Sequence, residues 1–330
     1  MITPKALKAA TAAAVLLSLL TPALAAGDAP VIERRAWSFS GINGKFDRAQ
    51  LQRGFQIYKD VCAACHGLKR INFRNLSEPG GPEFPVDSVK ALAASWPNQI
   101  FDGPNDAGEI ADRRGRVIKR PALLSDPILG PYDNDKAATT ANNGALPPDL
   151  SLITKSRTGA AEFHGPVWAH PLAMLKDMAT GYQEGGTDYV YALLTGYGEV
   201  PQYRRSPSGQ LVPAASAGAG PVEKCVTITK GEAGKPDVCN ALQEGMNYNS
   251  VFAGHQIAMI RPFTDGALKY QDGSPATTGQ YAQDIAAFLT WAGDPKLEER
   301  KDMGRRVLLY LLITSLLLYF AKKRLWSKLH

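Results

Sequence analysis

The chain has 330 residues, of which 45% are hydrophobic, 21% charged and 8% aromatic. This length allows one large domain or two average ones, and the composition excludes collagen, disorder and coiled coil. The formal charge is +6, but six basic residues lie in residues 1–25 and 322–330, which contain no acidic residue. The rest of the chain has 31 basic and 31 acidic residues, so we expect no nucleic-acid partner.

The first 25 residues have the order of a cleaved secretory signal. Lys5 and Lys8 precede an apolar run over residues 9–20, and Ala23-Leu24-Ala25 follows as a small-x-small cleavage site. We expect cleavage after Ala25 and export of the remaining chain.

The sequence CAACH at residues 62–66 is the attachment signature of c-type haem. Two thiols at this spacing, those of Cys62 and Cys65, add to the two vinyl groups, and the adjacent His66 reaches the iron. Disulfide exchange would need a thioredoxin-like βαβ setting and structural zinc a second ligand pair, and the sequence shows neither. Apolar residues at helical spacing over residues 45–66 predict a helix that delivers the motif, and a second helix is predicted over 281–292.

The second axial ligand of such a haem has several candidates. Met259 lies in an apolar loop closed by a proline, which is how a thioether is usually presented to haem. Met246 is a competitor, and His255 would give bis-histidine ligation. Met174 and Met178 are four residues apart in a predicted helix and are interpreted as core residues. Context favours Met259 and leaves Met246 and His255 open.

The C-terminal region predicts one transmembrane helix over residues 303–325. Residues 307–321 are uncharged, but as a helix they would rise only about 22 Å against a hydrocarbon core of about 30 Å. Basic side chains on both flanks, such as Arg306 and Lys322, can extend outward to the interface, where Trp326 also fits. Because the signal exports the body, we expect the final residues in the cytoplasm.

Six longer runs are distinctive in combination. They are CAACHGLKRINFRNL (62–76), GPNDAGE (103–109), RPALLSDPILGPYDN (120–134), ANNGALPPDLSLI (141–153), DYVYALLTGY (188–197) and GMNYNSVFAGHQIAM (245–259). With these runs and the C-terminal anchor, essentially the whole chain resembles the cytochrome c1 family, the haem-bearing subunit of the bc1 complex, in a bacterial form.

The resemblance implies a mainly α-helical c-type cytochrome domain with long Gly/Pro-rich loops, plus one C-terminal transmembrane helix. It implies one covalent haem c with His66 and Met259 as iron ligands, and it suggests that Arg120 and Tyr132 lie at the haem propionates. A guanidinium suits a propionate because it binds a carboxylate bidentately. The family usually has a proline directly after the ligand methionine, whereas here Ile260-Arg261 intervene.

We therefore expect a signal over 1–25, a periplasmic haem domain over 26–302, an anchor over 303–325 and a tail over 326–330. Residues 204–242 are longer than the minimal family pattern and contain low-complexity loop sequence. In an oxidising compartment, Cys225 and Cys239 are expected to close this insertion as a disulfide.

A haem with both axial positions filled leaves no site for O₂ or peroxide, which favours a one-electron relay over a catalytic haem. The sequence also contains no GxGxxG after a predicted strand and no second CxxCH. A cytochrome domain of a terminal oxidase is the alternative, and the run ANNGALPPDLS argues against it.

The resemblance implies an electron-transfer subunit that is not an enzyme as an isolated chain. Its neighbours would be cytochrome b and a Rieske iron-sulfur subunit, in a dimeric ubiquinol:cytochrome c oxidoreductase of the bacterial inner membrane. Its electron acceptor would be a c-type cytochrome. Two acidic clusters are candidate docking surfaces for this acceptor: Asp102, Asp106, Glu109 and Asp112, and Glu184 with Asp188.

Overall fold

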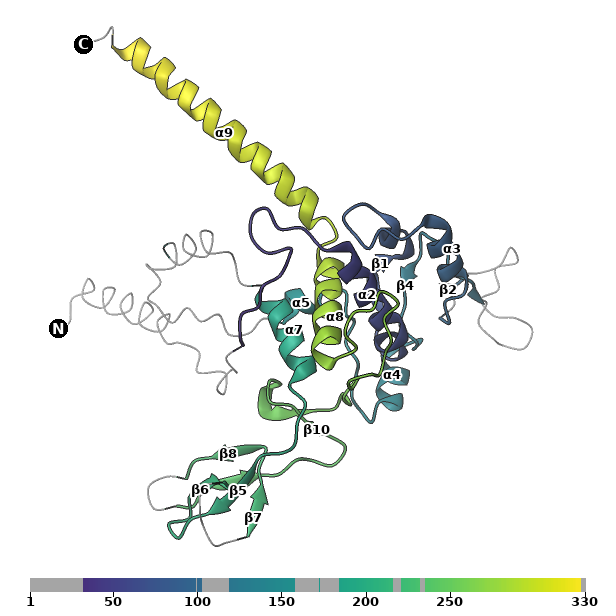
Figure 1. Ribbon diagram of the computed structural model, residues 1–330, viewed down its shortest axis with the longest axis vertical. Helices are drawn as coiled ribbons and strands as arrows, with labels where there is room; N and C mark the ends of the chain where they lie inside the picture. Colours follow the sequence, from purple (N-terminus) through teal and green to yellow (C-terminus); the bar gives the residue numbers. More distant parts are fainter. Residues whose placement is uncertain are drawn as a thin grey trace, which may run out of the picture.

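The structure, a computed structural model (Figure 1), describes residues 32–327 except 99, 103–118, 158–171, 173–183, 216–220 and 232–234. The expected signal, Met174, Met178 and three residues of the first acidic cluster (Asp106, Glu109 and Asp112) lie outside this part of the chain.

Helices dominate the described residues. They are α2 (Arg48–Asp60), α3 (Val86–Ala94), α4 (Asp135–Ala141), α5 (Ile153–Ser156), α7 (Gly185–Thr195), α8 (Thr278–Gly293) and α9 (Leu297–Trp326), with 3₁₀ turns at Cys62–Ala64, Phe73–Ser77 and Ala253–His255.

The strands are short and pair antiparallel. The pairs are β1 (Leu68–Asn72) with β4 (Pro127–Ile128), β2 (Ile100–Phe101) with β3 (Lys119–Arg120), β8 (Thr227–Thr229) with β9 (Val238–Asn240), and β10 (Asn247–Tyr248) with β11 (Gln256–Ile257); β5 (Gln202–Arg205) lies between β6 (Leu211–Pro213) and β7 (Val222–Lys224).

The core is built around α8, which packs against α2 on one side and α7 on the other (Figure 1). Helix α2 buries Leu51, Phe55 and Tyr58, at positions i, i+4 and i+7 of one face. The backbones of α2 and α8 approach closely at Gly54, where an added Cβ would lie 2.3 Å from the carbonyl oxygen of Asp284. Only glycine fits at this crossing.

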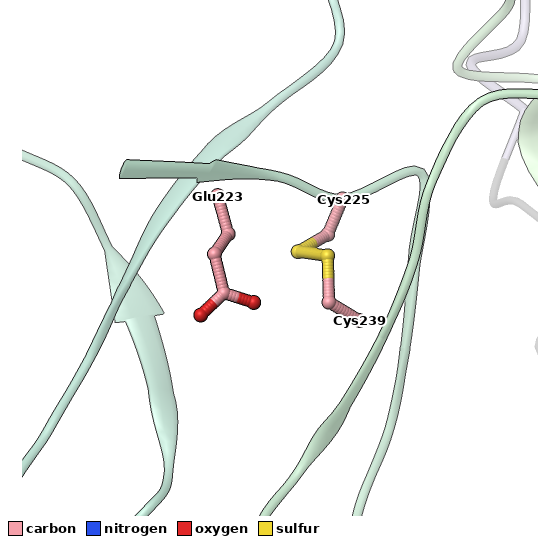
Figure 2. Close-up of side chains that lie close together, drawn as sticks. All are labelled: Glu223, Cys225 and Cys239. Atoms are coloured by element: carbon pink, nitrogen blue, oxygen red, sulfur yellow. A yellow bond between two sulfur atoms is a disulfide. The ribbon is translucent and has the colours of Figure 1, made fainter. Parts of the chain in front are cut away.

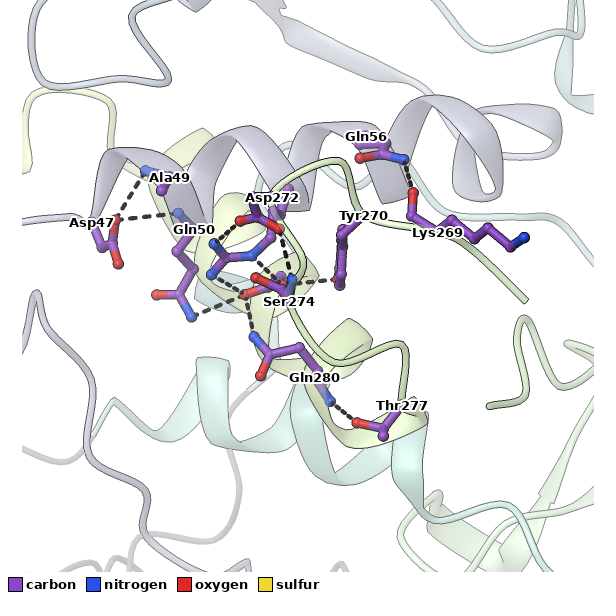
Figure 3. A network of polar contacts seen from close by, with 12 residues as sticks. Asp47, Ala49, Gln50, Gln56, Lys269, Tyr270, Asp272, Ser274, Thr277 and Gln280 are labelled. Atoms are coloured by element: carbon purple, nitrogen blue, oxygen red, sulfur yellow. Dashed lines mark hydrogen bonds and ion pairs between the residues drawn. The ribbon is translucent and has the colours of Figure 1, made fainter. Parts of the chain in front are cut away.

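A buried carboxylate joins the same two helices (Figure 3). Asp284 of α8 is fully buried and accepts hydrogen bonds from Nε and Nη2 of Arg53 at 2.9 and 3.2 Å. The hydroxyl of Tyr270 and the amides of Gln280 and Gln50 donate to it at 2.8, 2.9 and 3.3 Å. Its charge is therefore both paired and hydrogen-bonded, which makes its burial stable.

The described residues between 202 and 240 form a lobe of short strands, the β lobe, at the end of the domain opposite to α9 (Figure 1). Cys225 and Cys239 are joined by a disulfide, as expected, with a Cα–Cα distance of 5.2 Å (Figure 2). The bond links the segment after β7 to β9. The expected loop region therefore contains small sheets as well, and the disulfide ties them together.

Helix α9 contains the predicted anchor and is long and apolar enough to cross a membrane. It begins at the buried Leu297, six residues before the expected start, and its apolar side chains from Val307 onward are exposed. Its first turn is bound to the domain: Arg48 donates to both carboxylate oxygens of Glu298 at 2.7 and 2.9 Å, and the backbone N–H of Phe46 donates at 2.8 Å.

Candidate functional site

The CxxCH motif forms a tight turn after α2. The helix ends at Asp60, and the N–H groups of Cys65 and His66 both donate to the carbonyl of Cys62, at 3.1 and 2.9 Å. Both thiols are free and partly exposed, and burial raises the pKa of the Cys62 thiol. The turn therefore holds two unbonded sulfur atoms next to a histidine.

His66 is oriented by a backbone carbonyl. Its Nδ1 lies 2.7 Å from the carbonyl oxygen of Pro148, so Nδ1 carries the proton in the neutral ring and Nε2 keeps its lone pair. Burial lowers the pKa of His66, which favours the neutral form. Such an Nδ1–H···O=C contact is the arrangement that orients a histidine ligand toward a metal.

The residues after Pro148 fasten the run 141–153 to the haem motif. The N–H of Leu150 donates to the carbonyl of Gly67 at 2.9 Å, and the N–H of Lys69 donates to the carboxylate of Asp149 at 2.9 Å. A Cβ on Gly67 would lie 2.7 Å from the backbone nitrogen of Gly130, so this position requires close backbone packing. These contacts fix the carbonyl that orients His66.

Met259 follows β11 in the loop that leads to Pro262 and is partly exposed. The adjacent turn is strained, because His255 has a φ of +56°. The ring of His255 is held by its Nδ1, 3.3 Å from the carbonyl of Asn249. Met246 is also partly exposed. The choice among these three ligands remains a prediction.

Arg120 and Tyr132 already have partners. Nη1 and Nη2 of Arg120 bind the carboxylate of Asp126 at 2.5 and 3.1 Å, and Nε lies 3.1 Å from a carboxylate oxygen of Asp102. The hydroxyl of Tyr132 accepts a hydrogen bond from the amide of Asn142 at 3.1 Å. A propionate at Arg120 would therefore share its guanidinium with two carboxylates.

Asp188 of the second acidic cluster is buried and cannot be part of a docking surface. Asp188 is 0% exposed and accepts a hydrogen bond from Nε1 of Trp37 at 2.7 Å. Glu184 is partly buried, and burial raises its pKa. The expectation was wrong for Asp188, because α7 turns this side chain into the core. Asp102 of the first cluster is exposed and pairs with Arg120.

A group of metal-type ligands lies in the β lobe but does not form a metal site. Glu223 lies beside Cys225 and Cys239, and the disulfide uses both sulfur atoms (Figure 2). The carboxylate of Glu223 is bound instead by Arg205, with distances of 2.9 and 3.0 Å.

The free thiols, the oriented imidazole and the surrounding helices fit the haem of a c-type cytochrome domain. The sequence model described as "Cytochrome C1 family" matches residues 37–329. The chain therefore belongs to the cytochrome c1 family, the electron-transfer haem subunit of the bc1 complex. The expected mainly helical fold with one apolar C-terminal helix is confirmed.

Individual relatives agree with this assignment. The chain is 38% identical to cytochrome c1 of Blastochloris viridis over 91% of this chain and 87% of that protein. It is 34% identical to cytochrome c1 of Rhodospirillum rubrum over 97% and 96%. It is also 42% identical to "cytochrome b/c1" of Bradyrhizobium diazoefficiens over 89% of this chain, which spans 35% of that longer protein.

Proposed function

We propose that this chain carries one covalently attached haem c and relays single electrons from the Rieske iron-sulfur protein to a c-type cytochrome. The observation that supports this most directly is the contact of His66 Nδ1 with the carbonyl of Pro148, beside two free thiols. When bound, the haem supplies one-electron exchange between ferrous and ferric iron. The chain is not an enzyme by itself and acts within the ubiquinol:cytochrome c oxidoreductase.

Four residues of the chain would hold the haem, each in a different role. Cys62 and Cys65 would attach the porphyrin, and Nε2 of His66 and the thioether of Met259 would bind the iron. With both ligands in place the iron would not be open to O₂, and a His/Met pair would raise the reduction potential. This combination suits a relay between a quinol-fed donor and a high-potential acceptor.

We place the domain on the periplasmic face of the bacterial inner membrane, in a dimeric complex with cytochrome b and the Rieske subunit. The signal over 1–25 and the single anchor over 303–325 give this topology. The exposed apolar surface of α9 supports it, because such a surface is stable in lipid or against another membrane helix.

The proposed attachment is tested by denaturing electrophoresis and acid-acetone extraction. We expect haem to remain on the wild-type chain and to be lost or extractable in Cys65→Ala. Ala64→Ser, an exposed change in the same turn, is the matched control and should keep its haem. Extractable haem in the wild type would contradict covalent attachment, and full quinol-to-cytochrome turnover by a haem-free Cys65→Ala complex would contradict the relay.

The sixth ligand is tested by the weak sulfur-to-iron charge-transfer band of the ferric protein. Met259→Leu should abolish the band and lower the reduction potential, whereas Met246→Leu should leave both unchanged. The opposite pattern would assign the role to Met246. A band that is absent from the wild type would point to His255.

The propionate contact of Arg120 and Tyr132 also stays a proposal, and its strongest competitor is a second arginine. Arg157 follows α5, close enough to Tyr189 to oppose the rise in its pKa that burial causes, and no carboxylate of the described residues binds it. If Arg120 binds a propionate, Arg120→Gln should lower the reduction potential, because a positive charge that favours ferrous haem is lost, and should move the haem-linked pH dependence to higher pH, because the pKa of the propionate rises. A change in Arg157→Gln with none in Arg120→Gln would transfer the role.

A further inference from the structure

Tyr197 contacts the Met259 loop in two places. It lies two residues after the end of α7, and its hydroxyl donates to the carbonyl oxygen of Met259 at 3.1 Å. Its own carbonyl accepts a hydrogen bond from Nη2 of Arg261 at 2.6 Å. One residue therefore binds the loop on both sides of Ile260, across more than 60 positions of sequence.

The hydroxyl and the carbonyl of Tyr197 are held in place by buried contacts. Tyr197 is only 8% exposed, and its backbone forms an antiparallel bridge with the fully buried Asn249. The amide of Asn249 donates to the carbonyl of Leu193 in α7 at 2.8 Å, and its backbone N–H donates to the carbonyl of His255 at 3.1 Å.

The loop has little else to hold Met259 in place. No proline follows Met259 directly, so the backbone of residue 260 is free of that restriction. Ile260 is 73% exposed and contributes no buried anchor. Between the buried Ile257 and Phe263, the bond from Tyr197 to the carbonyl of Met259 holds the loop backbone among the described residues, and the bond from the Arg261 side chain ties the loop to the same tyrosine.

We propose that Tyr197 and Arg261 are positioning residues that hold the Met259 thioether in place as an iron ligand. This proposal rests on the proposed function, in which Met259 is that ligand. The hydroxyl fixes the carbonyl of Met259, and the Arg261 guanidinium ties the loop to the backbone of Tyr197 two residues later. Together they take the place of the proline that the family usually has after the methionine.

The test measures how easily an added ligand displaces Met259 from the full-length, haem-loaded protein in mild detergent. Ferric protein is titrated with imidazole at pH 7, and ferrous protein is exposed to carbon monoxide. Tyr197→Phe and Arg261→Gln each remove one hydrogen bond, so the half-saturating imidazole concentration should fall about three- to tenfold in each. Ferrous variants should bind carbon monoxide faster than the wild type. Arg261→Lys keeps a donor and should recover part of the wild-type value.

Remote substitutions of the same kind serve as controls. Tyr319 lies on α9, and Arg74 is an exposed residue of the 3₁₀ turn Phe73–Ser77. Tyr319→Phe and Arg74→Gln should therefore both titrate as the wild type. All variants are compared at equal haem content and equal far-UV circular dichroism, and Tyr197→Phe keeps the buried ring, so loss of folding is separated from loss of positioning.

The assignment of Met259 as the ligand and the positioning role of Tyr197 and Arg261 can be refuted separately. If Met259→Leu keeps the charge-transfer band, the ligand assignment is wrong. If Met259→Leu loses the band while Tyr197→Phe and Arg261→Gln titrate as the wild type, the ligand assignment stands and the positioning role is refuted.

Discussion

The crossing of α2 and α8 at Gly54 makes a strong prediction for Gly54→Ala. A Cβ at this position would lie 2.3 Å from the carbonyl oxygen of Asp284 and 2.5 Å from Cβ of Phe288, whereas ordinary contacts begin at 3.4 Å. The two helices must therefore separate by about 1 Å, and overpacking of this kind costs about 1–3 kcal/mol. Both groups are held in a helix, so neither can move alone.

The assay is thermal unfolding of the haem-loaded protein, followed by circular dichroism. A domain of this size loses about 2–4 °C in Tm for each kcal/mol, so Gly54→Ala should lower Tm by about 2–12 °C. Gly185→Ala is the matched control, because an added Cβ on this helical glycine has nothing within 4 Å, and Tm should stay equal or rise slightly. Equal Tm values for Gly54→Ala and the wild type would refute the close crossing.

Three further predictions concern buried and paired groups. Asp284→Asn should lower the free energy of unfolding by about 3 kcal/mol in denaturant titrations, because Arg53 loses its buried partner and keeps only the exposed Asp272. Replacing Cys225 and Cys239 by serine should destabilise the β lobe by about 3 kcal/mol, measured as faster hydrogen exchange of its strands, since the disulfide closes a loop of this size. The hydrogen bond from Arg120 lowers the pKa of Asp126, so its stabilisation is present above about pH 4 and is lost as pH falls through the lowered pKa. Asp126→Asn should therefore be less stable than the wild type at pH 7 and equal to it near pH 2; a constant difference would contradict this.

Local patterns predicted the two central helices well. The expected helix over 281–292 is α8, which starts three residues earlier because Thr277 caps it by accepting from the N–H of Gln280. The expected helix over 45–66 ends at Asp60 instead. Val61 leaves helical geometry, and the haem motif forms its own 3₁₀ turn. Apolar spacing continues through this turn, so periodicity could not place the break.

The contacts that complete the site are long-range and carry no local signal. Pro148 lies 82 positions from His66, and a run of two prolines does not show which carbonyl will meet an imidazole. Tyr197 is likewise far from Met259 in sequence. Asp188 was expected in an exposed acidic cluster because Glu184 lies near it in sequence. The structure shows that Asp188 lies on the buried face of α7. The CxxCH motif is therefore enough to predict a haem site, whereas the residues that contact His66 and Met259 are set by long-range packing of the chain.

The rigid junction at the start of α9 has a mechanical consequence. The first turn is bound to the domain through Glu298, and Lys301 reaches the carbonyl of Phe39 one turn later. From there the helix continues without a break to Trp326, about 45 Å in all. The membrane span and the domain are thus joined by one continuous helix. Any tilt of the span in the lipid therefore turns the whole domain through the same angle. If the chain relays electrons as proposed, a domain held in this way would stay with its anchor, and the donor and the acceptor would have to move to it.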